Sequence, residues 1–218
     1  TMINSSEPIA TIPPTFQDER NEILKSNNFL RDISKNGRLP NELSSPSFKY
    51  SGDSKGKVAH GTGKLKIGEH STYQGNFYKG RYHGYGEMTV SEGALYRGQF
   101  EGGVPRGQGV LEKKGDYEYR GEFGDNGLFS GSGVLDFGNG EYYEGGFKNG
   151  KFEGSGKYVW PGKMTFEGIY QNGLKHGEGI LKREGSCFLV KGIWDKGNLV
   201  KYELVQDIMH SMTLPFHP

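Results

Sequence analysis

The chain has 218 residues, of which 33% are hydrophobic and 24% are charged, and its formal net charge is +1. This composition excludes a thick aliphatic core, and the near-neutral balance excludes a long-range attraction for nucleic acid or an anionic membrane. Its one cysteine, Cys187, excludes an internal disulfide framework and a cysteine-rich metal site. No apolar run approaches the roughly 18 residues of a membrane span, and no signal peptide is recognisable. We therefore expect a cytoplasmic protein.

The first 49 residues contain no repeat and are rich in Pro, Ser and Asn, which is typical of a flexible tail or linker. Within the stretch 17–37, a short helix over 19–36 would place Ile23, Leu30 and Ile33 roughly on one face. Two interpretations stay open: an unstructured tail, or a segment that docks in a groove of its own chain or of a neighbouring copy. Because the chain begins with Thr1, we also expect a fragment of a longer protein.

Residues 50–200 repeat a pattern of rings and glycines. Each unit carries aromatic-x-Gly-x-aromatic, followed at a fixed distance by Gly-x-Gly, and successive good copies begin 23, 23, 24 and 23 residues apart. With a degenerate copy at each end, about seven repeats are expected. The five good copies are Tyr73/Gly75/Phe77, Tyr96/Gly98/Phe100, Tyr119/Gly121/Phe123, Tyr143/Gly145/Phe147 and Phe166/Gly168/Tyr170, followed by Gly84/Gly86, Gly107/Gly109, Gly131/Gly133, Gly154/Gly156 and Gly177/Gly179.

The pattern predicts one β-hairpin per repeat. Marked residues two apart point to the same face of a strand, so rings from one strand are expected to cover both glycines of the next. The predicted fold is an elongated, twisted, single-layer antiparallel sheet, about 65 Å long at roughly 4.8 Å per strand. Asn-Gly pairs favour tight hairpin turns. Expected turns are Lys79-Gly80, Asn126-Gly127, Asn149-Gly150 and Asn172-Gly173, and expected returns are Asn139-Gly140, Pro161-Gly162 and Glu184-Gly185.

Segments such as 143–156 and 166–179 resemble MORN (membrane occupation and recognition nexus) repeats, and the resemblance covers about 150 of the 218 residues. It implies the same array of hairpins. It also implies a binding or scaffolding module that takes a helical or extended partner segment in the groove of the curved sheet. Some such arrays accompany catalytic domains.

The last segment, 201–218, is predicted to cover the end of the array. Leu204, Val205, Ile208 and Met212 have helical spacing, so we expect a C-terminal capping helix over 202–212.

We expect no catalytic, cofactor-binding or metal site. A phosphate-binding glycine loop opens a helix, whereas Gly-x-Gly here lies inside a strand. His83 and His176 precede Gly-x-Gly as consensus turn residues without further metal ligands, and Cys187 has no neighbouring base.

We predict a non-catalytic scaffold or adaptor that binds a helical or extended segment of a partner protein on its ring-lined concave surface. Large rings supply contact area, although the same rings are also expected to hold the fold. Candidate groove rings are Tyr73, Phe77, Tyr82, Tyr85, Tyr96, Phe100, Tyr119, Phe123, Phe129, Tyr143, Phe147 and Phe152, and the polar candidates that adjust specificity are Arg97, Arg120, Glu122, Glu144 and Glu167.

Three alternatives remain. The array binds phospholipid at a membrane surface, although residues 50–200 hold 20 Lys/Arg against 18 Asp/Glu and show no strong basic cluster. In the second alternative, the array is the regulatory region of a larger enzyme. In the third, it assembles end to end into a homo-oligomer through exposed terminal strands. Cytoskeletal or membrane association is compatible with each of them, and nucleic acid is not an expected partner.

Overall fold

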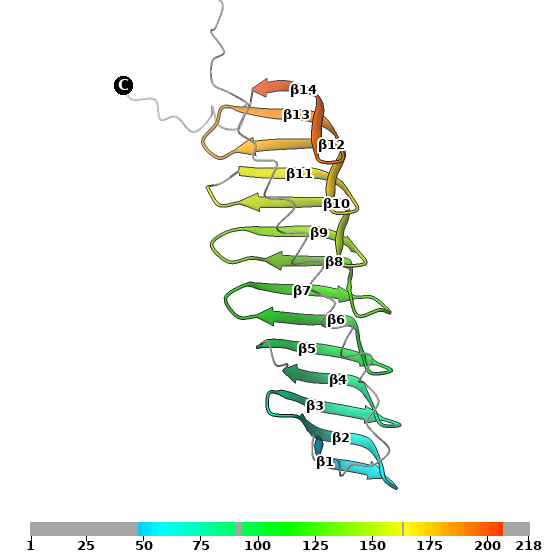
Figure 1. The fold of residues 1–218 in the computed structure, drawn as a ribbon. Helices are drawn as coiled ribbons and strands as arrows, with labels where there is room; N and C mark the ends of the chain where they lie inside the picture. The colour runs from blue at the N-terminus through cyan, green and yellow to red at the C-terminus, as the bar shows by residue number, and fades with distance from the viewer. Residues whose placement is uncertain (1–47, 90–92, 163, 207–218) are drawn as a thin grey trace, which may run out of the picture.

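The structure, a computed structural model, describes residues 48–89, 93–162 and 164–206. They form a single antiparallel sheet of 14 strands, in which each strand pairs with its neighbours in the chain. Figure 1 shows an elongated, twisted ribbon with β1 and β14 at its two ends, so the predicted single-layer hairpin array is confirmed. The strands are β1 (Phe48–Lys55), β2 (Val58–Ile67), β3 (Ser71–Tyr78), β4 (Arg81–Thr89), β5 (Ala94–Glu101), β6 (Val104–Lys113), β7 (Tyr117–Phe123), β8 (Phe129–Asp136), β9 (Tyr142–Lys148), β10 (Lys151–Trp160), β11 (Met164–Gln171), β12 (Leu174–Arg183), β13 (Phe188–Asp195) and β14 (Asn198–Gln206).

The predicted C-terminal helix is wrong where it can be compared. Residues 202–206 belong to β14, which pairs antiparallel with β13. Here apolar Tyr202 and Leu204 alternate with charged Lys201 and Glu203, a period of two that suits a strand better than a helix. Positions 207–212 of that helix, and the whole segment 17–37, lie outside the described residues.

A line of glycines crosses the sheet at right angles to the strands. In the register of the sheet, one glycine from each strand between β1 and β13 stands opposite the glycine of the next strand. We call this line the glycine ladder. In β14 its place is taken by Tyr202, opposite Gly192. Its members are Gly52, Gly63, Gly75, Gly86, Gly98, Gly109, Gly121, Gly133, Gly145, Gly156, Gly168, Gly179 and Gly192.

An aromatic ring lies against the ladder in each hairpin from β1–β2 to β11–β12. A Cβ placed on Gly86 would lie only 2.6 Å from the ring carbon Cε2 of Tyr73 in the preceding strand. A Cβ placed on Gly75 would lie 2.6 Å from the hydroxyl oxygen of the same tyrosine. The Tyr73 hydroxyl then donates a hydrogen bond to the carbonyl of Asn76 at 2.8 Å. Burial raises the pKa of Tyr73, so this donor stays protonated. The same contact joins Tyr50 to Gly63, Tyr96 to Gly109, Tyr119 to Gly133, Tyr143 to Gly156 and Phe166 to Gly179.

The first glycine of each Gly-x-Gly has a different task from the one expected. Between β3 and β4 the register moves from Gly75 opposite Gly86 to Asn76 opposite His83, so Gly84 and Tyr85 form a bulge. Gly84 has a φ of 60°, a left-handed conformation that suits glycine. The expectation that rings cover both glycines is therefore corrected: they cover the second, whereas the first permits the bulge. His83 lies inside β4 beside this bulge rather than in a turn.

Beyond the bulges in β4, β8 and β10 a second ring completes the core. Tyr82 stacks on Tyr73 with centroids 4.0 Å apart, and edge-on contacts from Phe77 and Phe100 surround the Tyr73 ring. Phe129 on Tyr119 and Phe152 on Tyr143 repeat the stack at 3.6 and 3.7 Å. These rings belong to one continuous buried cluster. We call the side of the sheet that carries it the ring face, and the opposite side the outer face.

Tight turns are confirmed at three of the four predicted hairpin tips, whereas Asn126-Gly127 lies in a longer loop between Phe123 and Phe129. Asn149 and Gly150 both have positive φ, as do Asn172 and Gly173, which is the geometry of a tight two-residue hairpin. Several tip glycines also tie their hairpin to the previous one: the N–H of Gly150, for example, donates to the carbonyl of Phe129 at 2.9 Å.

The ring contact predicts that two glycines of one strand tolerate alanine differently. Gly156 lies under Tyr143, whereas Gly154 has a φ of 71° and no atom within 4 Å of an added Cβ. We expect Gly156→Ala to cost about 2–3 kcal/mol because the ring and backbone must move, and Gly154→Ala about 1 kcal/mol from backbone strain alone. Urea unfolding measures the loss of stability in both variants. Equal losses would show that the Tyr143 ring does not require a residue without a Cβ beneath it.

Candidate binding groove

Most of the predicted groove rings lie inside the core. Their side chains are at most 4% exposed, because stacked and edge-on neighbours surround them. Tyr82, which the sequence analysis treated as a candidate contact, belongs to this set. These rings therefore have almost no free surface to offer to a partner, and they hold the sheet instead. They are Tyr73, Phe77, Tyr82, Tyr96, Phe100, Tyr119, Phe123, Phe129, Tyr143, Phe147 and Phe152.

The remaining candidates lie on the outer face. In Tyr-x-Gly the ring and the glycine face the core, so the middle residue must point the other way. Arg97, Arg120, Glu144 and Glu167 occupy this middle position and are exposed. Tyr85, the middle residue of Gly-x-Gly, is 64% exposed, and Glu122 lies beside the ladder glycine Gly121 and is also exposed.

Cross-strand pairing places several of these residues in one straight row. Arg97 stands opposite Val110, Val110 opposite Arg120, Arg120 opposite Val134, and Val134 opposite Glu144. The row crosses β5 to β9 next to the glycine ladder. Val110 and Val134 were missed from the sequence, although their place directly after Gly-x-Gly marks them as outward-facing.

A groove of about 980 Å³ follows this row across β4 to β9. We call it the outer groove. Its floor is ladder backbone at Gly98, Gly109, Gly121, Gly133 and Gly145, whose missing Cβ atoms would have pointed to the ring face. Its side chains come from Tyr85, Arg97, Gln108, Val110, Glu118, Arg120, Glu122, Ser132, Val134 and Glu144.

Ion pairs at the surface hold the basic groups of the outer groove. Arg97 Nε lies 2.8 Å from a Glu87 carboxylate oxygen, and Arg120 Nη2 lies 2.5 Å from Glu118. The hydrogen bond to Glu87 raises the pKa of Arg97, so that group is always charged. Such exposed pairs contribute little to stability, because solvent screens them. The groove charges are therefore free to serve binding with little effect on the fold.

A second hollow of about 550 Å³ lies on the outer face over β11 to β14. We call it the C-terminal groove. Its apolar side chains include Ile180 and Ile193, which are 37% and 41% exposed. Lys157 stands between the two grooves, and its side chain lies 3.0 Å from that of Glu167, which lines the C-terminal groove.

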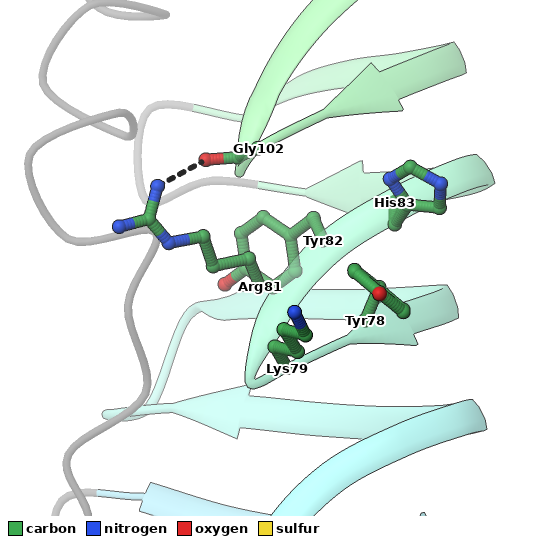
Figure 2. A pocket seen from close by; sticks show the side chains of 6 residues that line it. All are labelled: Tyr78, Lys79, Arg81, Tyr82, His83 and Gly102. Carbon is green, nitrogen blue, oxygen red and sulfur yellow. Dashed lines mark hydrogen bonds between the residues drawn. The ribbon is translucent and has the colours of Figure 1, made fainter.

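A third hollow of about 420 Å³ lies at the β3–β4 tip. Figure 2 shows Tyr78 and His83 near each other, with ring centroids 5.5 Å apart, and the Arg81 side chain extending away from them toward Gly102. The Arg81 guanidinium donates to the Gly102 carbonyl at 3.4 Å, which bridges two tips. These groups do not converge on a common point, so this hollow is not a built ligand site.

One buried amine interrupts the ring stack. Lys175 is 6% exposed and stands opposite Tyr170, the place that Tyr82, Phe129 and Phe152 hold in their own repeats. Its Nζ lies 4.6 Å from the centroid of Trp160. Burial lowers the pKa of Lys175 to about 8.

Within the described ranges, no three His, Cys, Asp or Glu side chains lie close enough to hold a metal ion. No helix in that part of the chain has the length and apolar character needed to cross a membrane.

A family model described as MORN repeat matches residues 73–93, 96–115, 119–142, 143–165 and 166–187, together about half of the chain. The chain belongs to the MORN repeat family. MORN repeats suggest a protein or membrane interaction module and are generally non-catalytic. They often occur in membrane-associated or cytoskeletal proteins. A comparison with curated proteins found no match.

The burial of Lys175 predicts an unusual pH dependence of stability. Its pKa falls from 10.5 to about 8 on folding, so the cost of charging the amine is fully present below pH 8 and is relieved as pH rises to 10.5. We expect Lys175→Met to stabilise the MORN array by about 1–3 kcal/mol at neutral pH. This advantage should shrink above pH 8. Chemical denaturation of the wild type and the variant across this pH range measures the difference in stability. Both proteins have the same tyrosines, so tyrosine ionisation cancels in that difference. An advantage of Lys175→Met that grows with pH would contradict the prediction.

Proposed function

We propose that this MORN array is a non-catalytic scaffold that binds a helical or extended segment of a partner protein in the outer groove. The observation that carries the proposal is the difference between the two faces of the sheet. The rings are buried in the core on the ring face, whereas the outer face has an open groove whose side chains the fold does not require.

The order of charges in the groove indicates the partner. Arg97 and Arg120 flank Val110 in one half of the row, and Glu144 follows Val134 at the other end. A segment with acidic residues on both sides of an apolar side chain, followed by a basic residue, complements this order. A uniformly charged polymer would face repulsion at one end.

A photo-crosslinking residue in place of Tyr85 tests the proposal. We expect it to capture a partner from cell extract through one segment with this pattern, which mass spectrometry identifies. The control for this experiment places the same crosslinking residue at Tyr78, which is 47% exposed and lies outside the outer groove. R97A/R120A should abolish capture without unfolding the protein, because exposed ion pairs contribute little to stability.

The control variant K148A/K151A removes two positive charges at a hairpin tip and should capture normally. If R97A/R120A keeps its circular dichroism spectrum and still captures the same segment, the outer groove is not the binding surface. Equal crosslinking from positions 78 and 85 would lead to the same conclusion.

A second candidate function, binding to an anionic membrane surface, is supported by the edge of the sheet that carries the hairpin tips. This edge, on the right in Figure 1, joins each odd-numbered strand to the next. Among its acidic residues, Glu101 and Asp125 are paired with Arg106, and Asp195 lies 3.5 Å from His176. Its exposed basic residues are Lys55, Lys57, Lys79, Arg81, Lys148, Lys151 and Lys196.

Vesicle sedimentation tests this second candidate. With vesicles that contain phosphatidylserine, K55E/K57E should weaken binding because each basic residue near the surface contributes about 1 kcal/mol. K64E/K66E, the same charge change on the adjacent β2, should have a smaller effect. Equal losses would indicate a response to net charge alone, and absence of binding at physiological salt would remove the candidate.

A further inference from the structure

The row of outward side chains that lines the outer groove continues into the C-terminal groove. The register places Glu144 opposite Lys157, Lys157 opposite Glu167, and Glu167 opposite Ile180. The outer groove ends at β9 and the C-terminal groove begins at β11, so only β10 lies between them. The side chains at this junction are accessible, since those of Lys157 and Glu167 are 41% and 59% exposed. The two grooves therefore follow one track on the outer face.

The floor of this track is not available for pairing with the backbone of a partner. Each strand from β5 to β12 has a hydrogen-bonded neighbour on both sides, so its N–H and C=O groups are engaged within the sheet. An extended segment gains main-chain hydrogen bonds at the free edge of a sheet and not on its face. An α-helix makes its backbone hydrogen bonds internally. A helix is therefore the partner conformation that loses no backbone hydrogen bonds on this face.

The spacing of the strands also matches a helix. Neighbouring positions in the row are about 4.8 Å apart, the distance between paired strands. Side chains three and four residues apart lie on one face of a helix, and they are separated by about 4.5 and 6 Å along its axis. From Arg97 to Ile180 the row takes seven steps, or about 34 Å. About 24 residues of helix cover 36 Å, so one heptad lies over each hairpin.

We infer that the partner segment is an α-helix of about 25 residues that lies along the row from Arg97 to Ile180, with one heptad over each hairpin. The inference rests on the proposed function of the outer groove and specifies its ligand. Charge complementarity gives the side chains of the helix that face the sheet. Over β9 to β12 they are basic, acidic, basic and apolar. Over β5 to β8 they are acidic, apolar, acidic and apolar, opposite Arg97, Val110, Arg120 and Val134.

Synthetic peptides of four heptads test this inference with the full 218-residue chain. The matched peptide carries Glu, Leu, Glu, Leu, Lys, Glu, Lys and Leu at the facing positions and Ala and Gln elsewhere, and it is made in both chain directions. A control peptide exchanges Glu and Lys. By fluorescence anisotropy, one matched peptide should bind, and its control should bind roughly tenfold more weakly or worse because like charges then meet.

Charge reversal on the protein completes the test. R97E/R120E should lose the matched peptide and should bind instead a peptide with Lys at the first two acidic positions, while its circular dichroism spectrum stays unchanged. K148A/K151A should bind the matched peptide as the wild type does. If the wild type binds neither matched peptide, or binds matched and control peptides equally, the inference is wrong. An R97E/R120E variant that shows no exchange of preference would contradict it as well.

Crosslinking separates this inference from the proposed function. Photo-crosslinking residues in place of Val110 and Ile180 should capture sites about 20 residues apart on the partner segment, because the six strand steps between them span about 29 Å. An extended segment would give a separation of about 9 residues. That shorter separation, or no capture from position 180, would overturn the helix while a segment still occupies the outer groove. Absence of any capture from position 85 would count against the proposed function itself.

Discussion

The contact between a tyrosine ring and a glycine on the next strand is the constraint on which this structure depends. A single-layer sheet has no second layer to pack against, so its apolar surface must be buried by its own side chains. The ring can lie flat on the sheet only where the neighbouring strand has no Cβ. The hydroxyl must still find a partner, and a backbone carbonyl three residues along the same strand accepts its hydrogen bond, as for Tyr73 and Asn76. Ring, bare backbone and hydrogen bond therefore recur together in successive hairpins.

Much of the fold was readable because these demands leave a periodic trace. The spacing of Tyr73 and Gly75, and its recurrence, identified the strands, the turns and the single layer. The two tasks of Gly84 and Gly86 could not be separated from their spacing, because both the bulge and the ring contact select glycine. The end of the array was misread because Leu204, Val205 and Ile208 fit a helical period, whereas pairing with β13 imposes a period of two on Tyr202 and Leu204.

The candidate site was only partly predictable. Alternation assigned Arg97 and Glu144 to the outward side of their strands, but it did not show which of the two faces remains open. Rings such as Tyr82 looked available because the sequence does not show that the chain beyond the bulge stacks them on Tyr73. Val110 and Val134 were overlooked because the predicted groove was built from rings and charged residues alone. A row across the sheet depends on strand register, which a bulge changes locally.

The alternation of inward rings and outward polar residues has a consequence for how such a protein can change. Because Tyr96 and Gly98 maintain the fold while Arg97 between them faces away, a substitution at position 97 changes the outer surface with little cost in stability. The same separation holds in each neighbouring hairpin, so the outward positions recur at a regular spacing across the sheet and can vary independently of one another. The outer surface of one scaffold can in this way change one residue at a time while every intermediate sequence still folds.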